Sequence, residues 1–127
     1  MKLQLTAQHL ELNDDIKKYV NKKINKLSRF VPRHAKSTAH VLVVLKQQKG
    51  KSANPFSCEA IVTLPHERFT VEEATMNIFA AVDIVEAKLK NSLRKYKEKH
   101  DDKRSDKRRI LDRFRRLADR DFWGSQN

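Results

Sequence analysis

Residues 78–99 read IFAAVDIVEAKLKNSLRKYKEK, and this one segment carries both an apolar stripe and a cationic surface. Apolar residues recur at steps of three and four, which is the spacing that an amphipathic helix turns toward a core. They are Ile78, Val82, Val85, Leu89, Leu93 and Tyr96. The basic residues of the second half mostly avoid this stripe, and they are Lys88, Lys90, Arg94, Lys95, Lys97 and Lys99. The pattern predicts a helix that is anchored by one side and holds its cations where they can meet a phosphate backbone.

Another basic helix is predicted from about residue 14 to residue 29. Asn13 supplies an N-cap, and Asp14 and Asp15 give an acidic first turn that suits the helix dipole. The apolar positions at helical spacing are Ile16, Val20, Ile24 and Leu27. The outer side carries Lys18, Lys22, Lys26 and Arg29, with Lys17 and Lys23 beside them. This outer side forms a second basic ridge.

Four strands are predicted from alternating or densely β-branched segments. They span residues 2–8, 36–48, 56–65 and 66–72, and the last helix is expected to begin near Thr75. The order βαβββα predicts an α+β fold, in which an open four-stranded sheet carries both helices on one face as a two-layer sandwich.

The 127 residues fit one domain, predicted over residues 1–100, and a tail over residues 101–127. The tail begins DDKRSDKRR, which contains no apolar residue and is typical of a solvated linker. A short apolar stripe at helical spacing follows at residues 110–118. The tail is therefore predicted to be a basic linker with a short amphipathic segment.

Lys and Arg number 28 against 16 Asp and Glu, which gives a formal net charge of +12. Such an excess is typical of nucleic-acid binding and would also suit an anionic membrane surface. No apolar run approaches the roughly 18 residues that a membrane span requires, and the N-terminus has no apolar signal core. We expect a soluble cytoplasmic protein without a membrane partner, and the single Cys58 suits that reducing compartment.

The residues of an enzyme active site are not indicated. The five histidines are scattered, with no HxxxH pair and no second cysteine to complete a zinc site. We therefore predict a protein that is not an enzyme and has no metal, cofactor or small-molecule substrate. Cys58 alternates with Phe56 and Ala60 and is expected to be a buried small hydrophobe. Asp83, inside an apolar segment, is expected to satisfy local polar groups or to orient a basic neighbour.

The two basic ridges allow two interpretations. Lysine and arginine commonly do no more than solvate the outer faces of helices. Here acidic residues do not intersperse on those faces, and the two helices are predicted to be neighbours, which favours phosphate binding. The strands offer no aromatic pair like that of an RRM, and no GXXG loop marks a KH domain, so recognition of structured RNA by shape fits better than base reading.

Two segments resemble one protein family. FAAVDIVEAKLKNSLRKYKEK is similar to the Y-A-A-I-D, K-L and Q-L-x-K-x-K pattern of the ribosome hibernation-promoting factor family, also called ribosome-associated inhibitor A or sigma-54 modulation protein. The matching residues are Phe79, Ala80, Ala81, Val82, Asp83, Lys88, Leu89, Leu93, Lys95 and Lys97. The helix LNDDIKKYVNKKINKLSRF matches at Ile16, Tyr19, Val20, Lys23, Ile24, Lys26, Leu27 and Phe30. With the element order, the resemblance covers about residues 1–99.

The resemblance implies a cytoplasmic factor of resting or stressed cells that lodges in the 30S ribosomal subunit, over the places of messenger and transfer RNA. It would inhibit translation sterically and be monomeric off the ribosome. The family-matched cations expected to contact 16S rRNA are Lys23, Lys26, Lys88, Lys95 and Lys97. The ridges alone add Lys22, Arg29, Lys90 and Arg94 to this expected site.

Some features depart from the family pattern. Phe79 replaces the usual Tyr and Ser92 the usual Gln, which puts any polar contact of those positions in doubt. The ending suggests a short-type member with its own tail, which would not pair two ribosomes through a second domain. The Arg-rich stretch 108–123 is expected to extend along the messenger channel, to dock on a nearby ribosomal surface, or to fold back on the domain. The alternative function is a protein-interaction adaptor whose anchors would be Phe114, Leu117, Phe122 and Trp123.

Overall fold

The computed structural model describes residues 1–100 and confirms the α+β fold with the order βαβββα. The strands are β1 (Lys2–Gln8), β2 (His40–Gln47), β3 (Phe56–Leu64) and β4 (Glu67–Thr75). The helices are α1 (Asp14–Asn25) and α2 (Ile78–His100), with two short 3-10 helices, η1 (Lys26–Phe30) and η2 (Arg33–Ala35). The predicted tail and its expected contacts lie outside the described residues.

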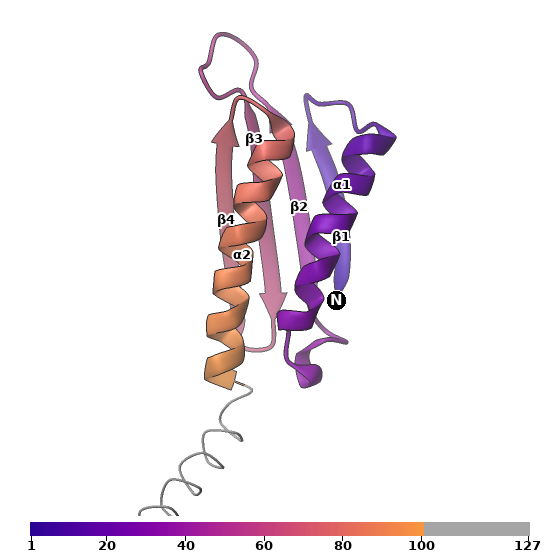
Figure 1. The fold of residues 1–127 in the computed structure, drawn as a ribbon, viewed down its shortest axis with the longest axis vertical. Coiled ribbons are helices and arrows are strands. Elements are labelled where there is room, and N and C mark those ends of the chain that lie inside the picture. The colour runs from indigo at the N-terminus through magenta and orange to yellow at the C-terminus, as the bar shows by residue number, and fades with distance from the viewer. Residues whose placement is uncertain (101–127) are drawn as a thin grey trace, which may run out of the picture.

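The four strands form one sheet in the order β1-β2-β3-β4. β1 runs parallel to β2 because α1 crosses over between them, and the two later pairs are antiparallel hairpins. Both helices lie side by side on one face of the sheet, as predicted, and they run in the same direction (Figure 1). Their C-terminal halves, which carry most of the basic residues, therefore lie at the same end of the molecule.

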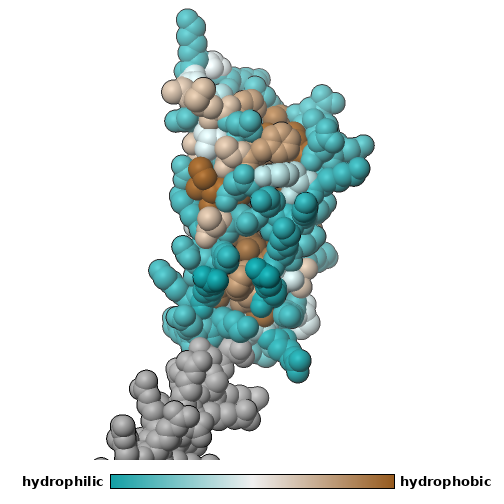
Figure 2. Space-filling model, in the orientation of Figure 1, coloured by the Kyte–Doolittle hydropathy of each residue, from teal (hydrophilic) through white to brown (hydrophobic). Residues whose placement is uncertain are grey.

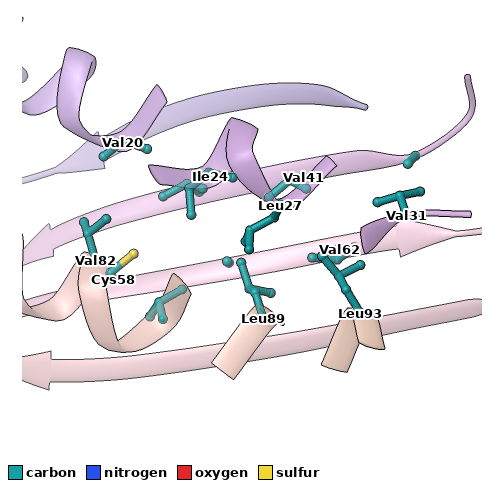
Figure 3. Close-up of a cluster of buried hydrophobic side chains, with 14 of the residues drawn as sticks. Val20, Ile24, Leu27, Val31, Val41, Cys58, Val62, Val82, Leu89 and Leu93 are labelled. Atoms are coloured by element: carbon teal, nitrogen blue, oxygen red, sulfur yellow. The ribbon is translucent and has the colours of Figure 1, made fainter. Parts of the chain in front are cut away.

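The core fills the space between the sheet and the two helices (Figure 3). The predicted stripes of both helices are buried, and each residue of these two stripes is at most 7% exposed. The strands contribute alternate residues such as Val43 and Ala60, which are fully buried. Cys58 is also fully buried, as predicted, and burial raises the pKa of its thiol to about 12.

The end of the first helix differs from the prediction. The α-helical hydrogen bonding ends at Asn25, and residues 26–30 continue as a 3-10 helix instead of completing the α-helix to residue 29. Val31 N–H donates to the Ser28 carbonyl at 3.1 Å, which closes this tighter turn before the buried Pro32. The tighter winding determines where the side chains of Arg29 and Phe30 lie.

Three other predicted boundaries were wrong by a few residues. Residues 36–39 do not belong to a strand, because the Ala39 N–H turns back to the Ala35 carbonyl at 2.9 Å and β2 begins at His40. β4 continues to Thr75, which pairs with Phe56. The last helix begins at Ile78, where the Asn77 side chain accepts a hydrogen bond from the Phe79 N–H at 2.8 Å and caps the helix.

Candidate nucleic-acid interface

The outer surface of the helical layer separates its charges along the helix axes. Most of the acidic residues lie toward the N-terminal ends, with Asp14 and Asp15 in the first turn of α1 and Asp83 in α2, while Glu98 lies near the C-terminal end of α2. The basic side chains of the outer ridge of the first helix, all exposed, are Lys18, Lys22, Lys26 and Arg29. Hydrophilic residues cover most of this face, and hydrophobic ones show mainly in its upper half (Figure 2). The basic residues of the layer lie mainly toward the C-terminal ends of both helices.

The two flanks of α2 have different neighbours. The flank toward the first helix is defined by contacts with α1 or η1, and it carries Phe79, Asp83, Glu86, Lys90 and Arg94. Lys97 lies about two turns after Lys90 and so falls on this same flank. The opposite flank faces β4, where Lys88 contacts Glu73, and Lys95 follows about two turns later.

A network of polar side chains joins α1 to the N-terminal half of α2. The Lys23 ammonium lies 3.5 Å from Asp83 Oδ1 and 4.0 Å from Glu86 Oε2, and 5.5 Å from the centre of the Tyr19 ring. The Tyr19 hydroxyl donates to Asp83, and this hydrogen bond, with burial and the nearby negative charge, raises the pKa of Tyr19 to about 12. Asp83 thus orients a basic neighbour, as expected, and the charge of Lys23 is compensated within the fold.

Phe79 adds an aromatic contact between the two helices, beside the polar network. It meets the Tyr19 ring edge to face, with ring centroids 5.0 Å apart and planes at 87°. The aromatic contact does not require a hydroxyl at position 79, and the polar contact to Asp83 comes from Tyr19. The contact with the first helix is therefore partly apolar and partly ionic.

Three cations surround one aromatic ring in the lower half. The Phe30 ring centroid lies 4.8 Å from the Arg29 guanidinium carbon, 5.3 Å from that of Arg94 and 5.5 Å from the Lys90 ammonium. Within residues 1–100, no carboxylate lies within 4.0 Å of any of these cations. We call Phe30, Arg29, Lys90 and Arg94 the Phe30 cluster.

The nine predicted site residues therefore occupy three environments. Those on the outer ridge or on the α2 flank toward the first helix are Lys22, Lys26, Arg29, Lys90, Arg94 and Lys97. Lys23 lies between the helices beside Asp83. Lys88 and Lys95 lie on the β4 flank, where the Lys88 ammonium is 2.6 Å from Glu73 Oε2 and 3.4 Å from the Glu72 carbonyl. The structure brings six of the nine toward one surface.

Sequence reasoning did not include Phe30 in the site. Its apolar side chain matched the family pattern, and it packs against the core as a partly buried residue. The available signal was its place directly after Arg29, at the end of the basic ridge. That Lys90 and Arg94, one helical turn apart, reach the same ring depends on the packing of α2 beside η1.

Other kinds of site are not built into the described part of the chain. In residues 1–100, no group of three His, Cys, Asp or Glu side chains is placed to hold a metal ion. None of the helices described here is long and apolar enough to cross a membrane. A hollow of about 410 Å³ lies at the β2–β3 hairpin end of the sheet, and its lining includes Gln8, Lys46, Gln48 and Asn54.

Comparison with known proteins identifies the family of this chain. Residues 3–101 match the family model for the sigma 54 modulation protein / S30EA ribosomal protein family. The ribosome hibernation promotion factor of Lactococcus lactis subsp. cremoris is 29% identical over 99 residues, which cover 76% of this chain and 50% of that protein. The protein of the same name from Staphylococcus aureus is 27% identical over 107 residues, which cover 84% of this chain and 54% of that protein. The chain spans about half the length of these relatives.

Solved structures share the fold. The crystal structure of the Thermus thermophilus Protein Y N-terminal domain aligns with a TM-score of 0.62 at 27% identity, over 76% of this chain and 99% of that one. A ribosomal subunit interface protein from Coxiella burnetii aligns with a TM-score of 0.61 at 22% identity, over 76% of this chain and 98% of that one. At this identity, the similarity supports the fold alone. Because the family match extends over residues 3–101 and these folds agree, the chain belongs to the sigma 54 modulation protein / S30EA ribosomal protein family.

Proposed function

We propose that this protein is a cytoplasmic ribosome hibernation factor that binds the 30S subunit at its decoding region. By contacting 16S rRNA there, it excludes messenger and transfer RNA and inhibits translation in resting or stressed cells. The observation that carries this proposal is the convergence of cations from two separate helices at the Phe30 cluster. The family membership and the names of the relatives, ribosome hibernation promotion factors, support it.

The arrangement favours contact with the RNA backbone over reading of bases. Cations fixed on a rigid layer of two helices can match the spacing of phosphates, and phosphate contacts supply most of the sequence-independent affinity. The outward positions of the four strands carry no Phe, Tyr or Trp on which bases would stack. The proposed site residues are Lys22, Lys23, Lys26, Arg29, Lys88, Lys90, Arg94, Lys95 and Lys97. Lys23 and Lys88 would first have to leave their carboxylate partners.

A competition assay with purified small subunits tests this function. We expect the wild-type chain to prevent the binding of messenger and transfer RNA to the subunit. Replacing Lys90 and Arg94 together by Glu reverses two cations that have no carboxylate within 4.0 Å in residues 1–100. Because phosphate contacts dominate the affinity, we expect this double variant to bind at least about tenfold more weakly.

The matched control replaces Lys2 and Arg68 by Glu. These exposed residues point away from the helices, since they lie on the outward side of β1 and β4, and the change in net charge is the same. We expect the control to compete within about threefold of wild type, because long-range charge is screened at physiological salt. Equal losses in the two variants would contradict a specific interface, and unhindered binding of transfer RNA beside the wild-type chain would contradict the proposed function.

A further inference from the structure

We propose that Phe30 is a positioning residue, whose ring gathers Arg29, Lys90 and Arg94 into one preformed site for a stretch of RNA phosphodiester backbone. This inference rests on the proposed function and specifies how the site is organised. Phe30 would contribute through the three cations and would not stack on a base.

The geometry supports this role because the ring lies where two elements distant in sequence meet. Arg29 precedes Phe30 in η1, while Lys90 and Arg94 reach the ring from α2. All three charged groups lie within 5.5 Å of the ring centroid, inside the distance of about 6 Å at which a cation is attracted to an aromatic face. The ring is partly buried and packs against the core, so its own position is fixed by the fold.

An uncharged organiser has an advantage over a carboxylate. Lys23 and Lys88 are also held in place, but by Asp83 and Glu73, whose negative charges would compete with a phosphate for the same ammonium. The Phe30 ring attracts cations through its quadrupole and leaves their charge available. Long basic side chains lose rotamer freedom when they bind, so holding three of them beforehand reduces that entropic cost.

The test measures affinity for two probes, purified small ribosomal subunits and a short A-form RNA duplex. Phe30→Leu retains an apolar side chain but removes the aromatic face, whereas Phe30→Tyr retains the face. We expect Phe30→Leu to bind both probes about tenfold more weakly and Phe30→Tyr to bind within about twofold of wild type. The slope of log affinity against log salt should stay unchanged in Phe30→Leu because no cation is lost, whereas Arg94→Gln should lower its magnitude by about 0.7–0.9.

A double-variant cycle separates the positioning role from base stacking. If Phe30 acts through Arg94, then Phe30→Leu combined with Arg94→Gln will lose less affinity than the product of the two single losses. Losses that multiply independently would mean that the ring contacts RNA itself, and this result would overturn the inference. Equal affinities of the Leu, Tyr and wild-type proteins would overturn it as well.

A measurement on the free wild-type protein tests the cluster without relying on the fold of the Leu variant. In wild type, the ring current of Phe30 should shift the NMR signals of the Arg94 side-chain methylenes upfield, and unshifted signals would contradict the cluster. Failure of the ribosomal function is distinguishable from failure of this inference. If wild type shows no preference for subunits over the duplex, the proposed function fails. The affinities of Phe30→Leu and Phe30→Tyr for the duplex still decide the role of Phe30 in that case.

Discussion

Individual basic residues on the two helices differ in how their charge is compensated. Lys23 and Lys88 each lie within 4.0 Å of a carboxylate, whereas Arg94 contacts the ring of Phe30 instead. Exposed ion pairs contribute little to stability, typically 0–1 kcal/mol, so the pairs of Lys23 and Lys88 are better understood as fixing side-chain direction. The local partner of a basic side chain therefore decides whether its charge is compensated within the fold.

At this same scale, Tyr19 makes stability depend on alkaline pH. Its folded-state pKa of about 12 exceeds the ordinary value of 10.0, so folding favours the neutral hydroxyl. The stabilisation is complete below pH 10 and is lost as the pH rises through about 12. We expect the difference in free energy of unfolding between wild type and Tyr19→Phe to shrink between about pH 8 and about pH 11. Urea denaturation measures this difference.

The comparison with Tyr19→Phe isolates the hydroxyl, because Cys58 and Tyr96, whose pKa values are also raised, are present in both proteins. A difference that stays constant over this pH range would show that the bond to Asp83 does not shift the titration of Tyr19.

At the scale of the element, α2 presents cations on two flanks that should contribute unequally. Lys88 is held by Glu73 at 2.6 Å, whereas Lys95, on the same flank, is exposed and has no carboxylate within 4.0 Å in residues 1–100. If Lys88 bound a phosphate, it would have to break its contact with Glu73, and this loss would offset part of the binding free energy. We expect Lys95→Gln to reduce small-subunit affinity more than Lys88→Gln, and equilibrium binding of both variants at one salt concentration measures this order. The reverse order would mean that Lys88 exchanges Glu73 for phosphate at little cost.

The sequence predicted the elements well where one helix or strand alone determines the pattern. The stripe of α2 and the alternation in β3 depend only on the repeat of each element, and both were found buried. The boundaries near Asn25, His40 and Thr75 depend on hydrogen bonds between segments or on local winding, which periodicity does not encode.

The site was only partly predictable for a related reason. Which residues lie on the outer ridge follows from helical spacing, but the pairing of Lys23 with Asp83 depends on how α1 packs beside α2. The convergence at Phe30 further depends on the 3-10 winding of η1. Neither contact is visible in a single helix, because each joins residues about 60 positions apart in the chain.

On the scale of the whole molecule, two parallel helices place most of their acids at one end of a layer and most of their bases at the other. The sheet holds this layer rigid through a continuous core, so the cations keep their relative positions. Such a surface suits a factor that occupies a site by charge and shape. In the proposed function, the molecule would act by excluding other ligands from the small subunit.

Ribosome binding is tested most simply by a sucrose-gradient profile of ribosomes from growth-arrested cells that produce this protein. We predict that the wild-type chain sediments with fractions that contain small subunits, and that the variant with Lys90 and Arg94 replaced by Glu remains at the top of the gradient. A wild-type chain found only at the top, or a variant that still sediments with small subunits, would contradict binding through the Phe30 cluster.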